Sequence, residues 1–234
     1  MKPLVGISLC LDEQGRWKAG RTYQYIDTAY SRAVEQAGGR VVHLPVQEDP
    51  ATLVESIHGL LIPGGDDLLP DSHYPDGVRF EPTPAAQLGF DRGLLSAALA
   101  ADLPILAVCY GMQLLALHHG GSLHYDIPTD LAGVDDHQLP EAEGRHPIEI
   151  ARGSRLEQAL GGCADPVNSR HHQAVSTPGG ALVACAHSAD GLIEAIEHPA
   201  GDFCIGVQWH PEKMDGPHRE NLFRAFVDAC GDRG

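Results

Sequence analysis

The chain has 234 residues, of which 16 are Lys or Arg and 32 are Asp or Glu, so its formal net charge is −16. Its hydrophobic fraction of 43% is that of a globular protein rather than a disordered one. The acidic balance excludes binding to nucleic acid or to anionic lipid surfaces through a general basic face. It leaves room for a small local anion pocket.

The six cysteines are scattered along the chain, and no two form a Cys-x-x-Cys pair. A disulfide framework is typical of small secreted chains that are denser in cysteine. The N-terminal residues lack the pattern of a signal peptide, and no apolar run approaches the roughly 20 residues of a membrane helix. We therefore expect a cytoplasmic protein with reduced cysteines and no membrane partner.

In the first half of the chain, short apolar runs alternate with helical patterns. The runs predict strands at residues 4–9, 40–44, 59–62 and 103–108, and the helical spacing predicts helices at 25–37, 52–57 and 84–101. Strands that alternate with helices form parallel sheets, so we expect an α/β fold with an open, mostly parallel sheet flanked by helices. Residues 62–84 are rich in Pro, Asp and Gly, which is typical of a functional loop.

From about residue 146 the pattern changes to short strands separated by turns. We expect these strands, at 148–151, 182–187, 192–197 and 203–209, to be antiparallel additions to the sheet. An amphipathic helix at 221–230 closes the chain. Because no linker and no internal repeat separates the halves, we predict one domain over residues 1–234.

The most informative stretch is the buried strand that runs into Cys109 and is followed by a helix. This strand–nucleophile–helix turn presents a side chain above the carboxyl end of a strand, where open α/β sheets bind ligands. The helix N-terminus favours a thiolate, and the N–H of Tyr110 is placed to stabilise an oxyanion. A buried cysteine that only packs is the alternative, and two further motifs argue against it.

One of these motifs ends a strand at His210 and returns through Pro211 to Glu212. A nucleophilic cysteine needs a base, and the base needs a third group to orient it. The other motif places Gly64 and Gly65 after a buried strand, where their N–H groups can complete an oxyanion hole.

Together these motifs resemble the class I glutamine amidotransferases of the triad type. Within that superfamily the chain is most similar to the γ-glutamyl-γ-aminobutyrate hydrolase-like branch, peptidase family C26. The matching segments are residues 63–67, 109–115, 120–123, 167–175, 190–195 and 206–212. The resemblance implies a flavodoxin-like α/β fold in a single domain.

The family pattern implies roles for individual residues. Cys109 would be the nucleophile, His210 the general base and then acid, and Glu212 its orienting partner. The oxyanion donors would be the N–H groups of Gly65 and Tyr110. The substrate-binding residues implied are Gly64, Gln113, Arg170, His171, His172 and Gln173.

The resemblance implies hydrolysis of the γ-glutamyl amide bond of γ-glutamyl-amines, such as γ-glutamyl-GABA-like substrates, through a γ-glutamyl thioester. Tyr110 stands where the branch commonly has Arg, which leaves the leaving amine open. A second hypothesis is a glutaminase subunit that supplies ammonia to a separate synthetase. A third is a non-catalytic or redox-sensing relative. The expected partner is a small-molecule γ-glutamyl amide, and a homodimer stays open.

The 14 histidines raise the question of a metal site. His118 and His119 are neighbours, as are His171 and His172, and adjacent side chains on a helix or strand rarely reach one metal ion. No His-Glu-x-x-His motif and no Cys/His ligand spacing is present. We therefore expect no metal and no cofactor.

Overall fold

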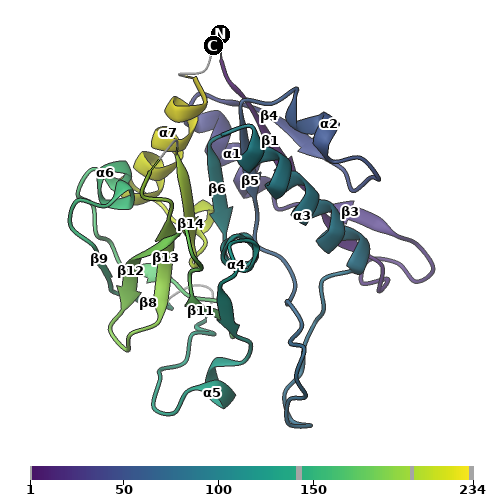
Figure 1. Ribbon diagram of the computed structural model, residues 1–234, viewed down its shortest axis with the longest axis vertical. Coiled ribbons are helices and arrows are strands. Elements are labelled where there is room, and N and C mark those ends of the chain that lie inside the picture. Colours follow the sequence, from purple (N-terminus) through teal and green to yellow (C-terminus); the bar gives the residue numbers. More distant parts are fainter. Residues whose placement is uncertain (1, 141–143, 201–202, 232–234) are drawn as a thin grey trace.

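The computed structural model describes residues 2–140, 144–200 and 203–231. Within these ranges, ten strands form one sheet in the order β4-β1-β5-β6-β14-β13-β11-β7, with β12 and β9 branching from β13 (Figure 1). The strands of this sheet are β1 Leu4–Ser8, β4 Arg40–Leu44, β5 Gly59–Ile62, β6 Ile105–Val108, β7 Ser122–His124, β9 Ile148–Ile150, β11 Ala174–Thr177, β12 Val183–Ser188, β13 Ile193–Glu197 and β14 Cys204–Val207.

Two short strand pairs lie outside this sheet. They are β2 Cys10–Asp12 with β3 Tyr23–Tyr25, and β8 Arg145–His146 with β10 Val167–Asn168. The helices are α1 Thr28–Gln36, α2 Ala51–Val54, α3 Ala85–Ala100, α4 Tyr110–His118, α5 Ile127–Asp130, α6 Arg155–Leu160 and α7 Pro217–Gly231, with a 3₁₀ turn at Pro211–Lys213.

The expected open α/β sheet, parallel at one side and antiparallel in the C-terminal half, is confirmed. Strands β4, β1, β5 and β6 are parallel neighbours, whereas β13 pairs antiparallel with β12, β11 and β14. The prediction that the strand near 203–209 is an antiparallel addition holds only toward β13. On its other side strand β14 runs parallel to β6, with Val207 beside Val108. All four of its residues are buried, as in a central parallel strand.

Helices cover both faces of the sheet and bury a core on each. On one face α1 and α7 contribute Tyr30 and Phe223, and on the other α3 and α4 contribute Leu94 and Leu115. Burying both faces explains why the central strands read as continuous apolar runs. The loop at 62–84 extends from the sheet toward the end of the molecule that carries α5 (Figure 1).

Several elements differ from the predicted ones. The helix expected from residue 25 begins at Thr28, because Asp27 caps it by accepting a hydrogen bond from the N–H of Ala29 at 2.8 Å. Tyr25 belongs instead to strand β3. Helix α6 and strands β7 and β11 were not predicted, since they are short and carry weak periodicity.

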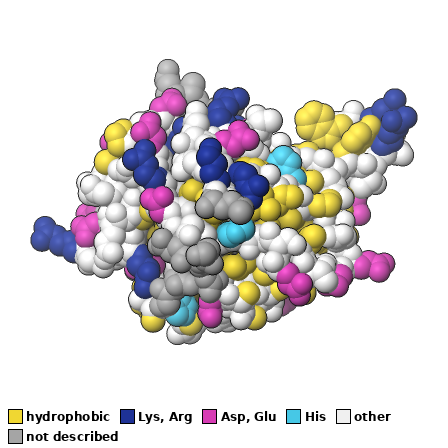
Figure 2. All heavy atoms as spheres, turned by 90° about the horizontal axis from the view of Figure 1, so that it is seen from above, with side chains coloured by type: hydrophobic (Ala, Val, Ile, Leu, Met, Phe, Trp, Pro, Cys, Tyr) yellow, Lys and Arg dark blue, Asp and Glu magenta, His cyan; other side chains and the backbone are white. Residues whose placement is uncertain are grey.

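The surface agrees with the composition. On the face shown in Figure 2, Lys and Arg side chains are dispersed among acidic and uncharged groups rather than gathered into a basic patch. Among the described helices, none is long and apolar enough to cross a membrane.

A close approach of backbone to backbone determines the turn between β6 and α4. A Cβ atom added at Gly111 would lie 2.4 Å from the carbonyl oxygen of Ile62 in β5. Real Cβ atoms do not approach a backbone oxygen so closely, so only glycine allows α4 to start this near the sheet.

We predict that Gly111→Ala destabilises the protein, because its methyl group must displace the β5 backbone. Overpacking of this kind costs about 1–3 kcal/mol of unfolding free energy, measurable by urea denaturation. Gly89→Ala in α3 is the matched control, because a Cβ there meets nothing within 4 Å. That change stabilises the helix by up to about 1 kcal/mol. Equal stability of the two variants would contradict the packing argument.

Candidate active site

Cys109 lies between the end of β6 and the start of α4 in a strained backbone conformation. Its φ is 49° and its ψ is −106°, in a region that side chains rarely adopt and that costs about 1–3 kcal/mol. Its N–H donates to the carbonyl of Val207 at 2.7 Å, which ties the turn to β14. The thiol forms no disulfide bond, and the residue is 8% exposed.

His210 follows β14 and is held by its side chain and its backbone. Its Nδ1 lies 2.8 Å from Oε1 of Glu212, whose side chain is 1% exposed. The amide of Asn168 accepts from the His210 N–H and donates to the His210 carbonyl, both at 2.8 Å. A base and its orienting carboxylate are therefore placed on a rigid backbone.

The electrostatics of His210 favour its protonated form. Burial lowers the pKa of His210, but the Glu212 carboxylate and the hydrogen bond with the Cys109 side chain outweigh burial and raise this pKa to about 10. An imidazolium beside a thiol favours the thiolate, the reactive form of cysteine. Cys109, His210 and Glu212 thus lie in the order that a nucleophilic triad requires.

A second polar side chain, that of Gln208, contacts the sulfur of Cys109. The buried amide of Gln208 donates to Cys109 Sγ at 3.3 Å. Its oxygen accepts from Nε2 of Gln113 at 3.3 Å, and that nitrogen also lies 3.2 Å from the carbonyl of Gln173. Gln113 therefore supports the group that contacts the sulfur, and its 3% exposure leaves little surface for a ligand.

The two residues whose N–H groups were predicted to bind an oxyanion, Gly65 and Tyr110, lie next to each other. A Cβ added at Gly65 would lie 3.3 Å from Cγ of the Tyr110 ring. In the described part of the chain, neither the Gly65 N–H nor the Tyr110 N–H donates to another protein group. The N–H of Gly64, by contrast, donates to the hydroxyl of Tyr30 at 2.9 Å and is occupied.

The side chain of Tyr110 points into the protein rather than toward a ligand. Its hydroxyl donates to Oδ2 of Asp91 at 3.0 Å, and Gln87 donates to the same oxygen at 3.3 Å. Burial raises the pKa of Asp91 to about 6, against the hydrogen bonds it accepts. Tyr110 thus anchors the start of α4 to α3 and supports Gly65.

Two cavities border Gly64 and Gly65, and Cys109 lines neither of them. One of about 690 Å³ is enclosed mainly by the loop after β5 and by α5, and Gly65, Arg170 and His172 line it. A smaller one of about 180 Å³ lies next to Gly64 and His210, and Arg170 lines it as well. Arg170 therefore borders both cavities, and the larger one lies within the size range of sites for small molecules.

The side chains of residues 170–173 do not all point toward the larger cavity. Arg170 and His172 face the larger cavity. His171 is turned away, since its Nδ1 donates to the Gln173 carbonyl at 3.0 Å and its ring is buried. The side chain of Gln173 bonds both the N–H and the carbonyl of Leu68, at 3.0 and 2.9 Å. Gln173 therefore holds the loop that walls the cavity.

His172 also holds this loop. Its Nε2 lies 3.0 Å from Asp67 and its Nδ1 lies 3.1 Å from Asp126. Its hydrogen bond with Asp67 raises its pKa although burial opposes the charge. This ring, held between two carboxylates, joins the loop after β5 to the start of α5.

Sequence analysis missed four residues that build this site: Tyr30, Asp91, Asn168 and Gln208. Asn168 stands inside the matched segment 167–175, and Gln208 stands inside 206–212. Both could have been found there as polar residues in otherwise apolar strands. Tyr30 and Asp91 lie on helices, and no local signal distinguishes them.

Comparison with known proteins places the chain in a family. The Peptidase C26 family model matches residues 3–212. The chain belongs to the peptidase C26 family. It is 31% identical over 242 residues to the γ-glutamyl-γ-aminobutyrate hydrolase of Escherichia coli, covering 97% of this chain and 93% of that one. It is 37% identical to a "Putative glutamine amidotransferase" of Mycobacterium tuberculosis, covering 98% of this chain and 75% of that one.

A solved structure has the same fold. The glutaminase domain of the Trypanosoma brucei CTPS, with bound acivicin, aligns with a TM-score of 0.65 at 15% identity, over 98% of this chain and 94% of that one. The predicted resemblance to class I glutamine amidotransferases is confirmed. The activity of the family is amide hydrolysis of the glutaminase type.

We predict a pH dependence from the His210–Glu212 pair. His210 keeps its proton until the pH approaches about 10, so amide hydrolysis falls with a midpoint near that pH as the acid for the leaving amine is lost. Glu212→Gln removes the carboxylate charge that raises the pKa, so the midpoint moves to lower pH. The pH profile of kcat/KM on a chromogenic γ-glutamyl anilide measures both. Identical alkaline midpoints would contradict the pairing.

Proposed function

We propose that this chain hydrolyses γ-glutamyl amides through a covalent thioester on Cys109, with His210 and Glu212 completing the triad. The observation that carries the proposal is the meeting of the three groups: Nδ1 of His210 lies 2.8 Å from Glu212, and the Cys109 side chain is close enough to the same ring to contribute to its raised pKa. Identity above 30% to a γ-glutamyl-γ-aminobutyrate hydrolase over nearly the whole chain supports it.

The first half of the reaction forms the thioester. The Cys109 thiolate attacks the γ-carbonyl carbon, and the carbonyl oxygen becomes an oxyanion that the Gly65 and Tyr110 N–H groups stabilise. His210 gives its proton to the amine nitrogen as the C–N bond breaks. The amine departs, and a γ-glutamyl thioester remains on the sulfur.

The second half releases glutamate. His210, now neutral, takes a proton from water, and the hydroxide attacks the thioester carbon. The oxyanion forms again at the same N–H groups, and the C–S bond breaks to return the thiolate. Glu212 holds His210 in one tautomer throughout, while Gln208 stabilises the sulfur charge that appears at the start and the end.

The cavities suit a zwitterionic glutamyl head group. Arg170 borders both cavities and can pair with the α-carboxylate. Asp66 and Asp67 line the larger one and can meet the α-ammonium, although Asp66 pairs with Arg16 at 2.8 Å and Asp67 with His172 at 3.0 Å. Local charges of both signs therefore recognise the substrate in a chain that is acidic as a whole.

The size of the larger cavity favours a leaving amine bigger than ammonia. At about 690 Å³ it extends from Gly65 to α5, beyond the space that a glutamine side chain fills. The alternative is a glutaminase subunit that passes ammonia to a synthetase. It is supported by the likeness to a "Putative glutamine amidotransferase".

We predict that a glutamine-analogue electrophile labels Cys109 and that Cys109→Ala abolishes labelling. The same change lowers kcat/KM by about 10³-fold or more, and His210→Asn is nearly as damaging, because triad members act as a unit. Cys163→Ala is the control, since Cys163 is a free and partly exposed thiol outside the site. Peptide mapping by mass spectrometry locates the label. Turnover by Cys109→Ala would exclude the mechanism.

A substrate panel separates the two candidate functions. We expect the purified chain alone to hydrolyse γ-glutamyl-GABA or another γ-glutamyl-amine faster than glutamine, because the larger cavity accommodates the amine. Amine release measured across the panel gives the ranking by kcat/KM. Activity on glutamine that appears only after a synthetase is added would favour the ammonia-supplying subunit. A chain that is labelled but turns over none of these substrates would favour the redox-sensing relative.

A further inference from the structure

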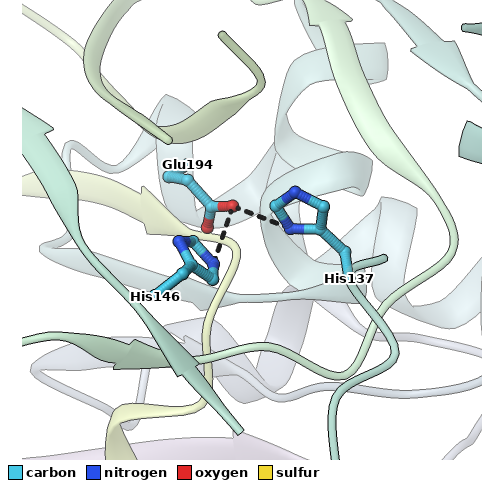
Figure 3. A group of neighbouring side chains, drawn as sticks. All are labelled: His137, His146 and Glu194. Atoms are coloured by element: carbon cyan, nitrogen blue, oxygen red, sulfur yellow. Dashed lines mark ion pairs between the residues drawn. The ribbon is translucent and has the colours of Figure 1, made fainter. Parts of the chain in front are cut away.

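A second group of titratable side chains lies away from the Cys109 turn, around the buried carboxylate of Glu194. Its residue is 0% exposed, and neither carboxylate oxygen has a hydrogen-bond partner in the part of the chain that the structure describes. Leaving a buried carboxylate without partners is costly. Figure 3 shows His137 and His146 pointing at this group from two segments of the chain.

Three imidazole nitrogens surround one carboxylate oxygen. Oε1 of Glu194 lies 3.5 Å from Nδ1 of His137, 3.5 Å from Nε2 of His146 and 3.7 Å from Nε2 of His171. Ligand atoms bound to a tetrahedral Zn²⁺ at about 2.0–2.1 Å lie about 3.4 Å from one another. The separations from Oε1 to His137 and His146 match two edges of a coordination tetrahedron, and the ligand atoms of His137, His146 and Glu194 all lie within 4.8 Å of one another.

The outward-facing nitrogens determine the tautomers. Nε2 of His137 lies 3.0 Å from the Asp190 carboxylate, and Nδ1 of His146 lies 3.1 Å from the Pro147 carbonyl. Nδ1 of His171 lies 3.0 Å from the Gln173 carbonyl. Each partner only accepts, so each of these nitrogens carries a proton, and in a neutral ring the opposite nitrogen then presents a lone pair to Glu194.

Ser169 cannot satisfy these lone pairs. Its Oγ lies 3.1 Å from His137 Nδ1 and 3.2 Å from His171 Nε2, and it also donates to the His137 carbonyl at 2.8 Å. One hydroxyl proton serves one acceptor at a time. His146 Nε2 is buried with no partner among the described residues. A group that accepts electron pairs is therefore missing from the centre of the cluster.

We propose that His137, His146 and Glu194 bind a divalent transition-metal ion, Zn²⁺, as a structural site, with His171 beside them. Neutral imidazole and carboxylate are the ligands that such an ion takes. Metal-bound histidines commonly donate their other ring N–H to a carboxylate or a carbonyl, and His137 and His146 both do so here. The ion would join His137 and His146 to β13, which lies about 50 residues further along the chain.

The competing occupant is a proton. Burial and the neighbouring Asp190 raise the pKa of Glu194 to about 8, so a neutral carboxyl could donate to one of the three lone pairs. The two occupants differ in their response to Glu194→Gln. An amide replaces a neutral carboxyl with little loss, whereas it is a poor ligand for Zn²⁺.

The test uses the untagged full chain and its metal content. We expect close to one zinc per chain by mass spectrometry of the purified protein. Removal of zinc by a chelator should lower the midpoint of thermal unfolding by several degrees, and added Zn²⁺ should restore it. Glu194→Gln and His146→Gln should weaken Zn²⁺ binding at least tenfold, with His187→Gln, an exposed histidine of β12, as the matched control.

Two results would overturn the proposal. One is a chain that purifies without zinc and whose thermal midpoint does not respond to Zn²⁺. The other is Zn²⁺ binding that is equal in wild type, Glu194→Gln and His187→Gln. Should the cluster variants fail to fold, Co²⁺ loaded into the stripped wild-type protein gives the answer: strong visible absorption of a tetrahedral centre supports the site, and its absence contradicts it.

Discussion

The parallel pairing of β14 with β6 brings the reactive groups together. With Val207 beside Val108, both strands end at the same edge of the sheet, and the Cys109 N–H bonds the Val207 carbonyl at 2.7 Å. The residues that follow β14 then carry the reactive groups: Gln208 donates to the sulfur, and His210 comes two residues later. An antiparallel β14 would send His210 to the opposite edge of the sheet. The two hydrogen bonds between Asn168 and the His210 backbone depend on this register, and so does the position of His210 beside Gly64.

The sequence predicts those features of the fold and the site that depend on neighbouring residues, and not those that depend on contacts between distant ones. Strands at 40–44 and 59–62 were predicted to the residue, because Gly39 or His58 precedes each run and a proline follows it. Cys109 and His210 stand at strand ends within recognisable motifs. The direction of β14 could not be read, because a buried run is compatible with either direction. Gln208 and Asn168 act on residues 99 and 42 positions away, so only the folded chain shows their partners.

Side chains that alternate in direction along residues 168–172 contribute both to the Cys109 site and to the cluster around Glu194. Asn168 holds the backbone of His210, while Arg170 and His172 face the larger cavity. His171 lies between them and points to Glu194. His171 and His172 therefore point in different directions, in agreement with the expectation that adjacent histidines do not share a metal ion. His137 and His146 were not part of that expectation, because only the fold brings them close to His171.

The account depends on a covalent bond between Cys109 and the glutamyl group. The most direct measurement is mass spectrometry of the enzyme quenched in acid during turnover of a γ-glutamyl amide. The account predicts a mass gain of one glutamyl group, located on the peptide that carries Cys109 and removed by hydroxylamine, as expected for a thioester. Turnover without any such adduct, or an adduct on another residue, would contradict it.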